Sequence, residues 1–225
     1  MDQAAESPWI GLIGGLGVGS TIHYYRELVK AHEARGKVAR LLIAHADMAR
    51  VLQAARTGDR DGMAAYLAGL VRHLAAGGAQ IAAVSAVIPH MCIRELTALS
   101  PIPLVNVVQE TAREIRRRGF RRVSLFGARF VVESRMFGQL EDIDIVMPSA
   151  EELSEIHDTY FQMANAAAGT KQHFETLRHM AHTLMVRGAE AIVFAGTDLS
   201  LAFNEGNTDF PHVDCAKLHI EAIAR

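Results

Sequence analysis

Two segments far apart in the chain share one strand-and-turn pattern, and this repeat restricts the fold more than any other feature. Residues 78–86 read GAQIAAVSA and residues 188–196 read GAEAIVFAG, so a Gly-Ala pair and a short apolar run recur in the same order. A second pair, LIG at 12–14 and LFG at 125–127, recurs at a similar separation. Repetition within a chain indicates a duplicated structural unit. We therefore expect two lobes of similar architecture.

Within each half, short apolar runs of strand length alternate with helical patterns. Strands are predicted at residues 9–13, 40–44, 81–85, 122–126, 143–146 and 191–194. Helices are predicted at residues 62–76, 91–99, 111–118, 131–140 and 151–186, and from residue 215 onward. Such alternation favours parallel sheets with right-handed crossovers. The predicted fold is α/β, with two similar lobes related by a pseudo-twofold axis, each a mainly parallel sheet flanked by helices.

The predicted first lobe comprises residues 1–103 and 206–225, and the predicted second lobe comprises residues 104–205. Pro101 and Pro103 break the chain before the second half, and the closing helix is expected to return to the first lobe. Ligands of parallel sheets bind outside the carboxyl ends of the strands. The loops at Ala86 and Gly196 should therefore face each other across one cleft.

The charge and cysteine content of the 225 residues argue against several classes of partner. A formal net charge of −2 gives no overall attraction to nucleic acid or to an anionic membrane. The one basic cluster, at residues 116–122, suits a helix C-terminus. Two cysteines are too few for a disulfide framework, and the acidic first six residues do not resemble a secretory signal. We expect a cytoplasmic protein without a membrane span.

The glycine-rich turn at residues 14–20 partly mimics a dinucleotide-binding fingerprint. Gly15 and Gly17 fit that pattern, but Ser20 stands where its last glycine belongs, and the acidic Asp47 comes too late. The alternative is a tight turn whose backbone N–H groups approach a ligand. Ser20 or Thr21 would cap the helix that follows. Gly15, Gly17, Ser20 and Thr21 are accordingly candidate ligand-binding residues.

From about residue 9 to the C-terminus, the chain resembles the cofactor-independent aspartate racemases of the aspartate/glutamate racemase superfamily. The resemblance rests on the order and spacing of several short motifs. They are IGLIGGLG at 10–17, ST at 20–21, YYR at 24–26, His90, EL at 95–96, PL at 103–104, ET at 110–111, LFG at 125–127, GAE at 188–190, GTD at 196–198 and Asp214. The resemblance implies the two-lobed fold, a small-molecule ligand, no cofactor or metal, and a possible homodimer.

Family members resembling this chain use two cysteines, one in each lobe, to remove and return a proton on opposite faces of the substrate carbon. The resemblance places the first in a Cys-Asn-Thr-Ala-His pattern, which here reads Ala86-Val87-Ile88-Pro89-His90. It places the second in Gly-Cys-Thr-Glu, which here begins with Ala195 and Gly196. Both thiol positions are therefore substituted, by Ala86 and Gly196.

Polar groups that help to hold a substrate carboxylate in those relatives are also replaced. Val87 and Ile88 stand for an asparagine and a threonine, and Ala128 and Val131 stand for two threonines. A carboxylate buried without partners costs several kcal/mol, so we expect the pocket to reject aspartate. Cys92 could act as a displaced nucleophile at a helix N-terminus or be a small buried apolar residue, and Cys215 is expected to be structural.

The remaining candidates for chemistry come from the ends of predicted strands. Asp47 and Arg50 either bind a carboxylate or form a solvated loop, and His90 either transfers a proton or hydrogen-bonds its own loop. Thr197 and Asp198 would contact a ligand or backbone amides. The candidate acid–base groups are His90, Asp47 and Asp198; the further candidate binding residues are Arg50, Ser85 and Thr197.

Three functions remain open from the sequence. The first is a redirected enzyme that performs isomerase, decarboxylase or lyase chemistry on a small carboxylated or carbonyl substrate. The second is a catalytically silent homologue that binds a ligand or a partner protein. The third is an ordinary aspartate or glutamate racemase, against which the missing thiols argue.

Overall fold

The computed structural model describes residues 7–225. The prediction that the chain has no secretory signal concerns residues 1–6, which lie outside the described residues. None of the helices in residues 7–225 combines the length and the apolar composition that a membrane span requires.

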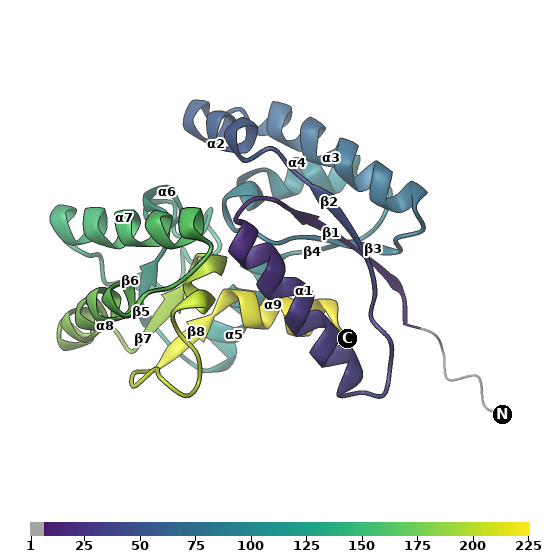
Figure 1. Ribbon diagram of the computed structural model, residues 1–225. Coiled ribbons are helices and arrows are strands. Elements are labelled where there is room, and N and C mark those ends of the chain that lie inside the picture. The colour runs from purple at the N-terminus through teal and green to yellow at the C-terminus, as the bar shows by residue number, and fades with distance from the viewer. Residues whose placement is uncertain (1–6) are drawn as a thin grey trace.

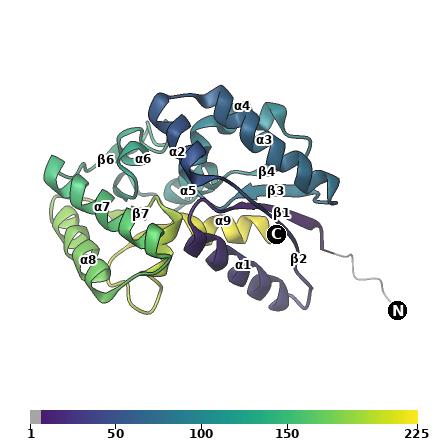
Figure 2. The ribbon, with the colours of Figure 1, turned by 45° about the horizontal axis from the view of Figure 1, so that its top comes forward.

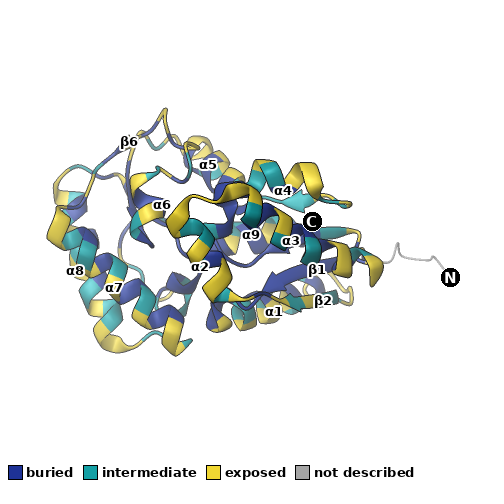
Figure 3. Ribbon diagram, turned by 90° about the horizontal axis from the view of Figure 1, so that it is seen from above, coloured by how far each residue is buried: buried dark blue, intermediate teal, exposed yellow. Residues whose placement is uncertain are grey.

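The first sheet has four parallel strands in the order β2-β1-β3-β4. Its strands are β1 (Trp9–Gly14), β2 (Arg40–His45), β3 (Ile81–Val84) and β4 (Leu104–Val105). The helices of this half are α1 (Val18–Glu33), α2 (Met48–Thr57), α3 (Arg60–Ala76) and α4 (Ile93–Leu99), with a 3-10 helix η1 (Ile88–Cys92) after β3. Strand β1 is buried between layers of helices whose outer faces are exposed, as Figure 3 shows for α2 and α3.

The second sheet repeats this plan, with parallel strands in the order β6-β5-β7-β8. Its strands are β5 (Arg122–Phe126), β6 (Asp144–Ile145), β7 (Ala191–Phe194) and β8 (His212–Asp214). Its helices are α5 (Val107–Arg117), α6 (Arg129–Glu133), α7 (Ala150–Ala166) and α8 (Lys171–Val186), with the 3-10 helix η2 (Thr197–Leu201) after β7. The closing helix α9 (Cys215–Ile223) packs its apolar residues into a core cluster of the first lobe, as expected. Because the strand orders match, the predicted pair of similar α/β lobes is confirmed (Figure 1).

Several element boundaries differ from those predicted. The helical pattern at 151–186 divides into α7 and α8, because Ala167 adopts a left-handed conformation and Thr170 caps a new helix. Helix α6 ends at Glu133 and turns follow it, whereas the sequence predicted a helix to residue 140. Helix α2 and strands β4 and β8 were not predicted. Helix α1 begins after Gly17, whose position offers no capping side chain of its own, so Ser20 and Thr21 lie inside the first turns of the helix rather than at its cap.

The division of the chain at residues 103 and 205 stays a prediction, but two strands lie in a sheet other than the one it implies. Strand β4 belongs to the first sheet through its pairing with β3, and β8 belongs to the second through its pairing with β7. Helix α9 lies against both α1 and α5 in the region between the sheets (Figure 2). There His219 joins three segments, since Nδ1 lies 3.0 Å from the Tyr24 hydroxyl and Nε2 lies 2.9 Å from the Val105 carbonyl oxygen.

Candidate active site between the lobes

A buried hydrogen-bond network ties the two lobes together where β3 and β7 end. Ser20 Oγ, in the first turn of α1, lies 2.7 Å from the carbonyl oxygen of Ser85 and 2.9 Å from Thr197 Oγ1. Thr197 Oγ1 lies 3.1 Å from the same carbonyl oxygen. All three residues are fully buried. Ala86 and Gly196, each adjacent in sequence to a member of this network, therefore lie on loops that meet.

The glycine-rich turn is held by Thr21 from within the first lobe. Thr21 Oγ1 accepts a hydrogen bond from the Gly15 N–H at 3.0 Å and donates one to the Gly17 carbonyl oxygen at 2.8 Å. The Ser85 hydroxyl donates to the Ile13 carbonyl oxygen at 3.1 Å. The hydroxyls that the sequence offered as ligand-binding groups thus bind the protein's own backbone. In this structure they fix the frame of the site.

Asp198 is the buried acidic group at the centre of the interface. Its Oδ1 accepts a hydrogen bond from the Ser20 N–H at 3.1 Å, so a carboxylate of the second lobe caps the N-terminus of the 16-residue helix α1. The contact is close because residue 17 is glycine: a Cβ there would lie 2.7 Å from Asp198 Oδ2. A helix N-terminus stabilises a nearby negative charge.

The acidity of Asp198 reflects two opposing effects. Burial raises its pKa to about 6, while the Ser20 N–H and the Tyr160 hydroxyl favour the charged form and limit the rise. Within residues 7–225 Oδ2 is buried and has no hydrogen-bond partner of regular geometry, and the Tyr160 hydroxyl lowers the pKa by favouring the carboxylate as a hydrogen-bond donor. Asp198 therefore changes its charge near neutral pH.

A small cavity of about 40 Å³ lies against this carboxylate. From the first lobe it is lined by Leu16, Met48, Val51, Leu52, Ala86, Val87, Ile88 and Pro89; from the second it is lined by Tyr160, Phe161, Ala164, Asn165 and Asp198. The two ionisable residues in this lining, Tyr160 and Asp198, both belong to the second lobe. A volume of this size holds about one water molecule, so a larger ligand requires the lining residues to move.

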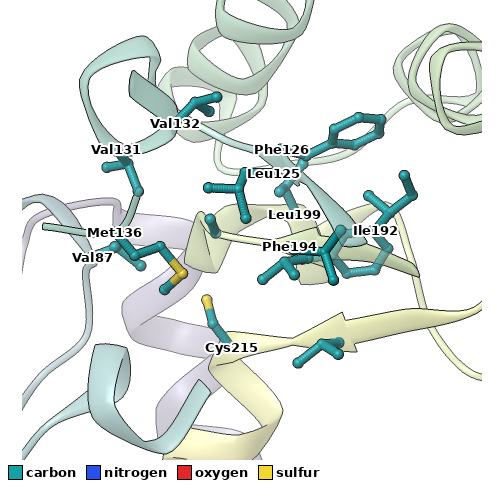
Figure 4. Packing of buried hydrophobic residues seen from close by; sticks show 14 of the residues in the cluster. Val87, Leu125, Phe126, Val131, Val132, Met136, Ile192, Phe194, Leu199 and Cys215 are labelled. Atoms are coloured by element: carbon teal, nitrogen blue, oxygen red, sulfur yellow. The ribbon is translucent and has the colours of Figure 1, made fainter. Parts of the chain in front are cut away.

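The apolar positions beside Ala86 pack the lobes against each other. Val87 comes from the first lobe but belongs to the hydrophobic core of the second, together with Ala128 and Val131, and each is at most 4% exposed. Figure 4 shows Val87 and Val131 in this cluster together with Met136 and Cys215. The residues that the sequence predicted to replace carboxylate-binding groups thus form interlobe packing.

Asp47 and Arg50 do not line the cavity. Asp47 Oδ1 caps α2 by accepting a hydrogen bond from the Ala49 N–H at 2.9 Å. The Arg50 guanidinium lies 4.2 Å from the centre of the Tyr66 ring, in a cation–π contact. The strand end that was expected to point both residues into the cleft instead starts a surface helix.

His90 supports the loop that carries Ala86. Its Nδ1 lies 2.9 Å from the Ala86 carbonyl oxygen, and burial lowers its pKa to about 4. The neutral ring therefore donates from Nδ1 to that carbonyl. His90 is not among the residues that line the cavity, and in this structure its ring hydrogen-bonds its own loop.

Neither cysteine is placed to act as a nucleophile in the cleft. Cys92 is fully buried, its Sγ lies 3.2 Å from the Pro89 carbonyl oxygen, and burial raises its pKa to about 12. Burial also raises the pKa of Cys215 well above its usual value. Both residues are absent from the cavity lining. A thiol this buried reacts slowly, because the thiolate is the reactive form.

Tyr160 is the site residue that the sequence did not reveal. It lies in the middle of α7, on the same buried face as Ile156 and Met163, and this spacing indicates only a core position. Its proximity to Asp198 depends on packing between elements remote in sequence. No local motif marks such a contact.

The surface features considered in the sequence have ordinary partners. Arg116 pairs with Asp142, Arg117 and Arg118 pair with Glu114, and Arg122 pairs with Asp144. In the part of the chain that the structure describes, no group of three histidine, cysteine or acidic side chains is arranged to hold a metal ion.

Comparison with known proteins agrees with this architecture. The family model for Asp/Glu/hydantoin racemases matches residues 13–223. A candidate Asp/Glu racemase from Yersinia pestis superposes with a TM-score of 0.81 at 22% identity, covering 97% of this chain and 98% of that one. An aspartate racemase homologue from Pyrococcus horikoshii superposes with a TM-score of 0.78 at 23% identity, covering 96% and 97%.

A more distant likeness connects the fold with another activity. A double mutant of arylmalonate decarboxylase in its liganded form superposes with a TM-score of 0.57 at 13% identity, covering 97% of this chain and 92% of that one. At these identities the solved structures bear on the fold alone, while the family model spans nearly the whole sequence. The chain therefore belongs to the Asp/Glu/hydantoin racemase family.

Proposed function

We propose that this protein is an enzyme that moves a proton on one face of a small carbonyl or carboxylate substrate with an apolar portion. The observation that carries the proposal is the one-sided distribution of ionisable groups around the cavity. Asp198 and Tyr160 line the second-lobe wall, whereas Ala86, Val87 and Ile88 line the opposite wall. Racemisation by two groups requires an acid and a base on opposite faces of the carbon. Ionisable groups on only one wall of the cavity favour isomerase, decarboxylase or lyase chemistry.

Asp198 is the acid–base group in this proposal. As a carboxylate it takes a proton from the carbon next to a carbonyl: an O–H bond forms on Asp198, the electrons of the broken C–H bond form a carbon–carbon double bond, and the π electrons of the carbonyl group move to its oxygen. The proton then returns to another atom on the same face of the substrate, or it is exchanged with water. A pKa near 6 suits both steps at neutral pH.

Helix α1 supports this step through its dipole. Its N-terminus faces Asp198 at the Ser20 N–H. When Asp198 accepts the proton and loses its charge, the helix N-terminus becomes free to stabilise the negative charge that forms on the substrate. A dicarboxylate such as aspartate would instead place a second negative charge beside Asp198, next to aliphatic carbons. We therefore do not propose two-thiol racemase activity.

The test is proton exchange in deuterated water, followed by NMR over a panel of small 2-aryl, 2-alkyl and 3-alkyl carbonyl and carboxylate compounds, with aspartate and glutamate included. We expect deuterium at one carbon without loss of enantiomeric purity. Asp198→Asn should reduce the rate at least 100-fold, while Asp158→Asn, exposed on α7 of the same lobe, should not. Racemisation of aspartate, or unaltered exchange in Asp198→Asn, would contradict the proposal.

A second candidate, a catalytically silent binding protein, is favoured by two observations. The cavity is only about 40 Å³, and Val87 joins the core of the opposite lobe. Absence of deuterium incorporation from the whole panel, together with thermal stabilisation by one of its members, would support that candidate over the enzyme.

A further inference from the structure

The backbone conformation of residue 196 does not require glycine. Its φ of −148° and ψ of 125° lie in the extended region, which any residue adopts. A Cβ at this position would nevertheless lie 2.4 Å from Cε2, 2.8 Å from Cζ and 3.0 Å from Cδ2 of Tyr160. Carbon atoms in a packed interior do not approach so closely. The Tyr160 ring therefore occupies the space in which a side chain of residue 196 would lie.

The ring cannot easily vacate that space. Tyr160 is 6% exposed and lies in the second-lobe core. Its ring meets the ring of Phe161 edge to face, with centroids 5.4 Å apart. The atoms nearest residue 196 belong to the aromatic ring itself rather than to the flexible end of a long chain.

The hydroxyl of Tyr160 acts on Asp198. It favours the ionised carboxyl, and the charge of Asp198 in turn helps burial to raise the pKa of the phenol well above its usual value. The phenol therefore keeps its proton at neutral pH. One side chain of α7 thus serves two positions of the loop after β7: its ring fills the space beside residue 196, and Tyr160 lines the same cavity as Asp198.

We propose that Tyr160 is the size-determining and positioning residue of this site, with its ring in the side-chain space of residue 196 and its hydroxyl oriented toward the Asp198 carboxyl. This inference rests on the proposed function for its role in chemistry. In this arrangement the space beside residue 196, on the loop after β7, is filled by a side chain from helix α7. Residues 160 and 196 are then a matched pair, in which a side chain at 196 requires a smaller residue at 160.

A double-mutant cycle on stability tests the matched pair without any substrate. Gly196→Ala should lower the urea midpoint of the protein. In a Tyr160→Ala background the same substitution should leave the midpoint unchanged or raise it, because the methyl group enters vacated space. In a Phe174→Ala background, which removes a ring packed on Phe203, Gly196→Ala should still destabilise. Equal effects of Gly196→Ala in all backgrounds would overturn the pairing.

A carboxyl titration tests the positioning role. The Asp198 ¹³C resonance, assigned by comparison with Asp198→Asn, should titrate near pH 6 in the parent protein. Tyr160→Phe keeps the ring but removes the O–H group that favours the carboxylate, so the midpoint should rise. Tyr25→Phe, on the exposed face of α1, should leave it unchanged. A midpoint that stays or falls in Tyr160→Phe would overturn this role.

These measurements separate the inference from the proposed function. If the cycle and the titration behave as expected but no compound exchanges deuterium, the matched pair stands and the enzymatic role of Tyr160 falls with the proposed function. If exchange occurs with an unchanged pH–rate profile in Tyr160→Phe, the proposed function stands and the positioning role is overturned.

Discussion

The Ser20 N–H donates a hydrogen bond to Asp198 Oδ1 across 3.1 Å, and this contact joins a helix of one lobe to a carboxylate of the other. The same serine uses its hydroxyl to contact Ser85 and Thr197. A buried carboxylate, a helix N-terminus and two strand ends therefore meet at one residue. The junction therefore fixes the position of the Asp198 carboxyl relative to helix α1.

Thr197→Val should destabilise the protein by about 1–2 kcal/mol, because the valine cannot hydrogen-bond the Ser85 carbonyl oxygen that Thr197 Oγ1 now approaches at 3.1 Å. Urea denaturation measures the change. Thr97→Val is the matched control, since Thr97 is exposed on α4 and bonds only its own helix. Equal effects of the two substitutions would argue against an energetic role for the interlobe network.

Val87→Asn tests whether the aliphatic residue beside Ala86 holds the lobes together. Restoring an amide at this position places an unpaired polar group in a site that is 1% exposed, so we expect a loss of about 1–3 kcal/mol. Val38→Asn, at a residue that is 78% exposed, should change stability by less than about 0.5 kcal/mol. A Val87→Asn protein as stable as its parent would indicate an open, hydrated cleft.

As the pH rises, His90 should make the folded protein more stable, whereas Asp198 should make it less stable. Burial lowers the His90 pKa from 6.5 to about 4, so its neutral folded form is favoured above pH 6.5 and this contribution is lost as the pH falls toward 4. Burial raises the Asp198 pKa from 3.8 to about 6, so Asp198 makes stability decrease as the pH rises from 4 to 6. Each effect is worth about 3 kcal/mol.

Denaturation curves between pH 4 and 7 check this prediction. His90→Asn should flatten the rise of stability with pH, whereas Asp198→Asn should steepen it. The exposed His73→Asn should leave the slope near that of the parent. A slope that changes in the same direction in His90→Asn and Asp198→Asn would contradict the assignment.

Neither cysteine should react with an aromatic disulfide reagent in the native protein. Both are fully buried, and burial raises both thiol pKa values. In denaturant both thiols should react, which serves as the control for reagent and protein concentration. Rapid native labelling of Cys92, abolished by Cys92→Ala, would instead support the displaced nucleophile that the sequence left open.

The repeated segments were sufficient to predict two α/β lobes. A parallel strand that is buried on both faces needs a continuous run of apolar residues, and such a run can be recognised in the sequence. The same repeat correctly indicated β3 and β7. Strands β4, with two residues, and β8, with three, were not predicted as parts of their sheets. Strands so short carry almost no periodicity, and their sheets are decided by pairing partners remote in the chain.

The sequence by itself determined the strand–helix alternation, the family resemblance and the absence of cysteine at residues 86 and 196. It also identified Ser20, Ser85, Thr197 and Asp198 as candidates, since each lies near a strand end or glycine turn. Only the tertiary structure decided that Asp198 caps α1, that Arg50 and Asp47 lie away from the cavity, and that the Tyr160 ring fills the space at residue 196. Those relationships arise where two lobes pack, and packing depends on distances between elements that no local pattern of residues encodes.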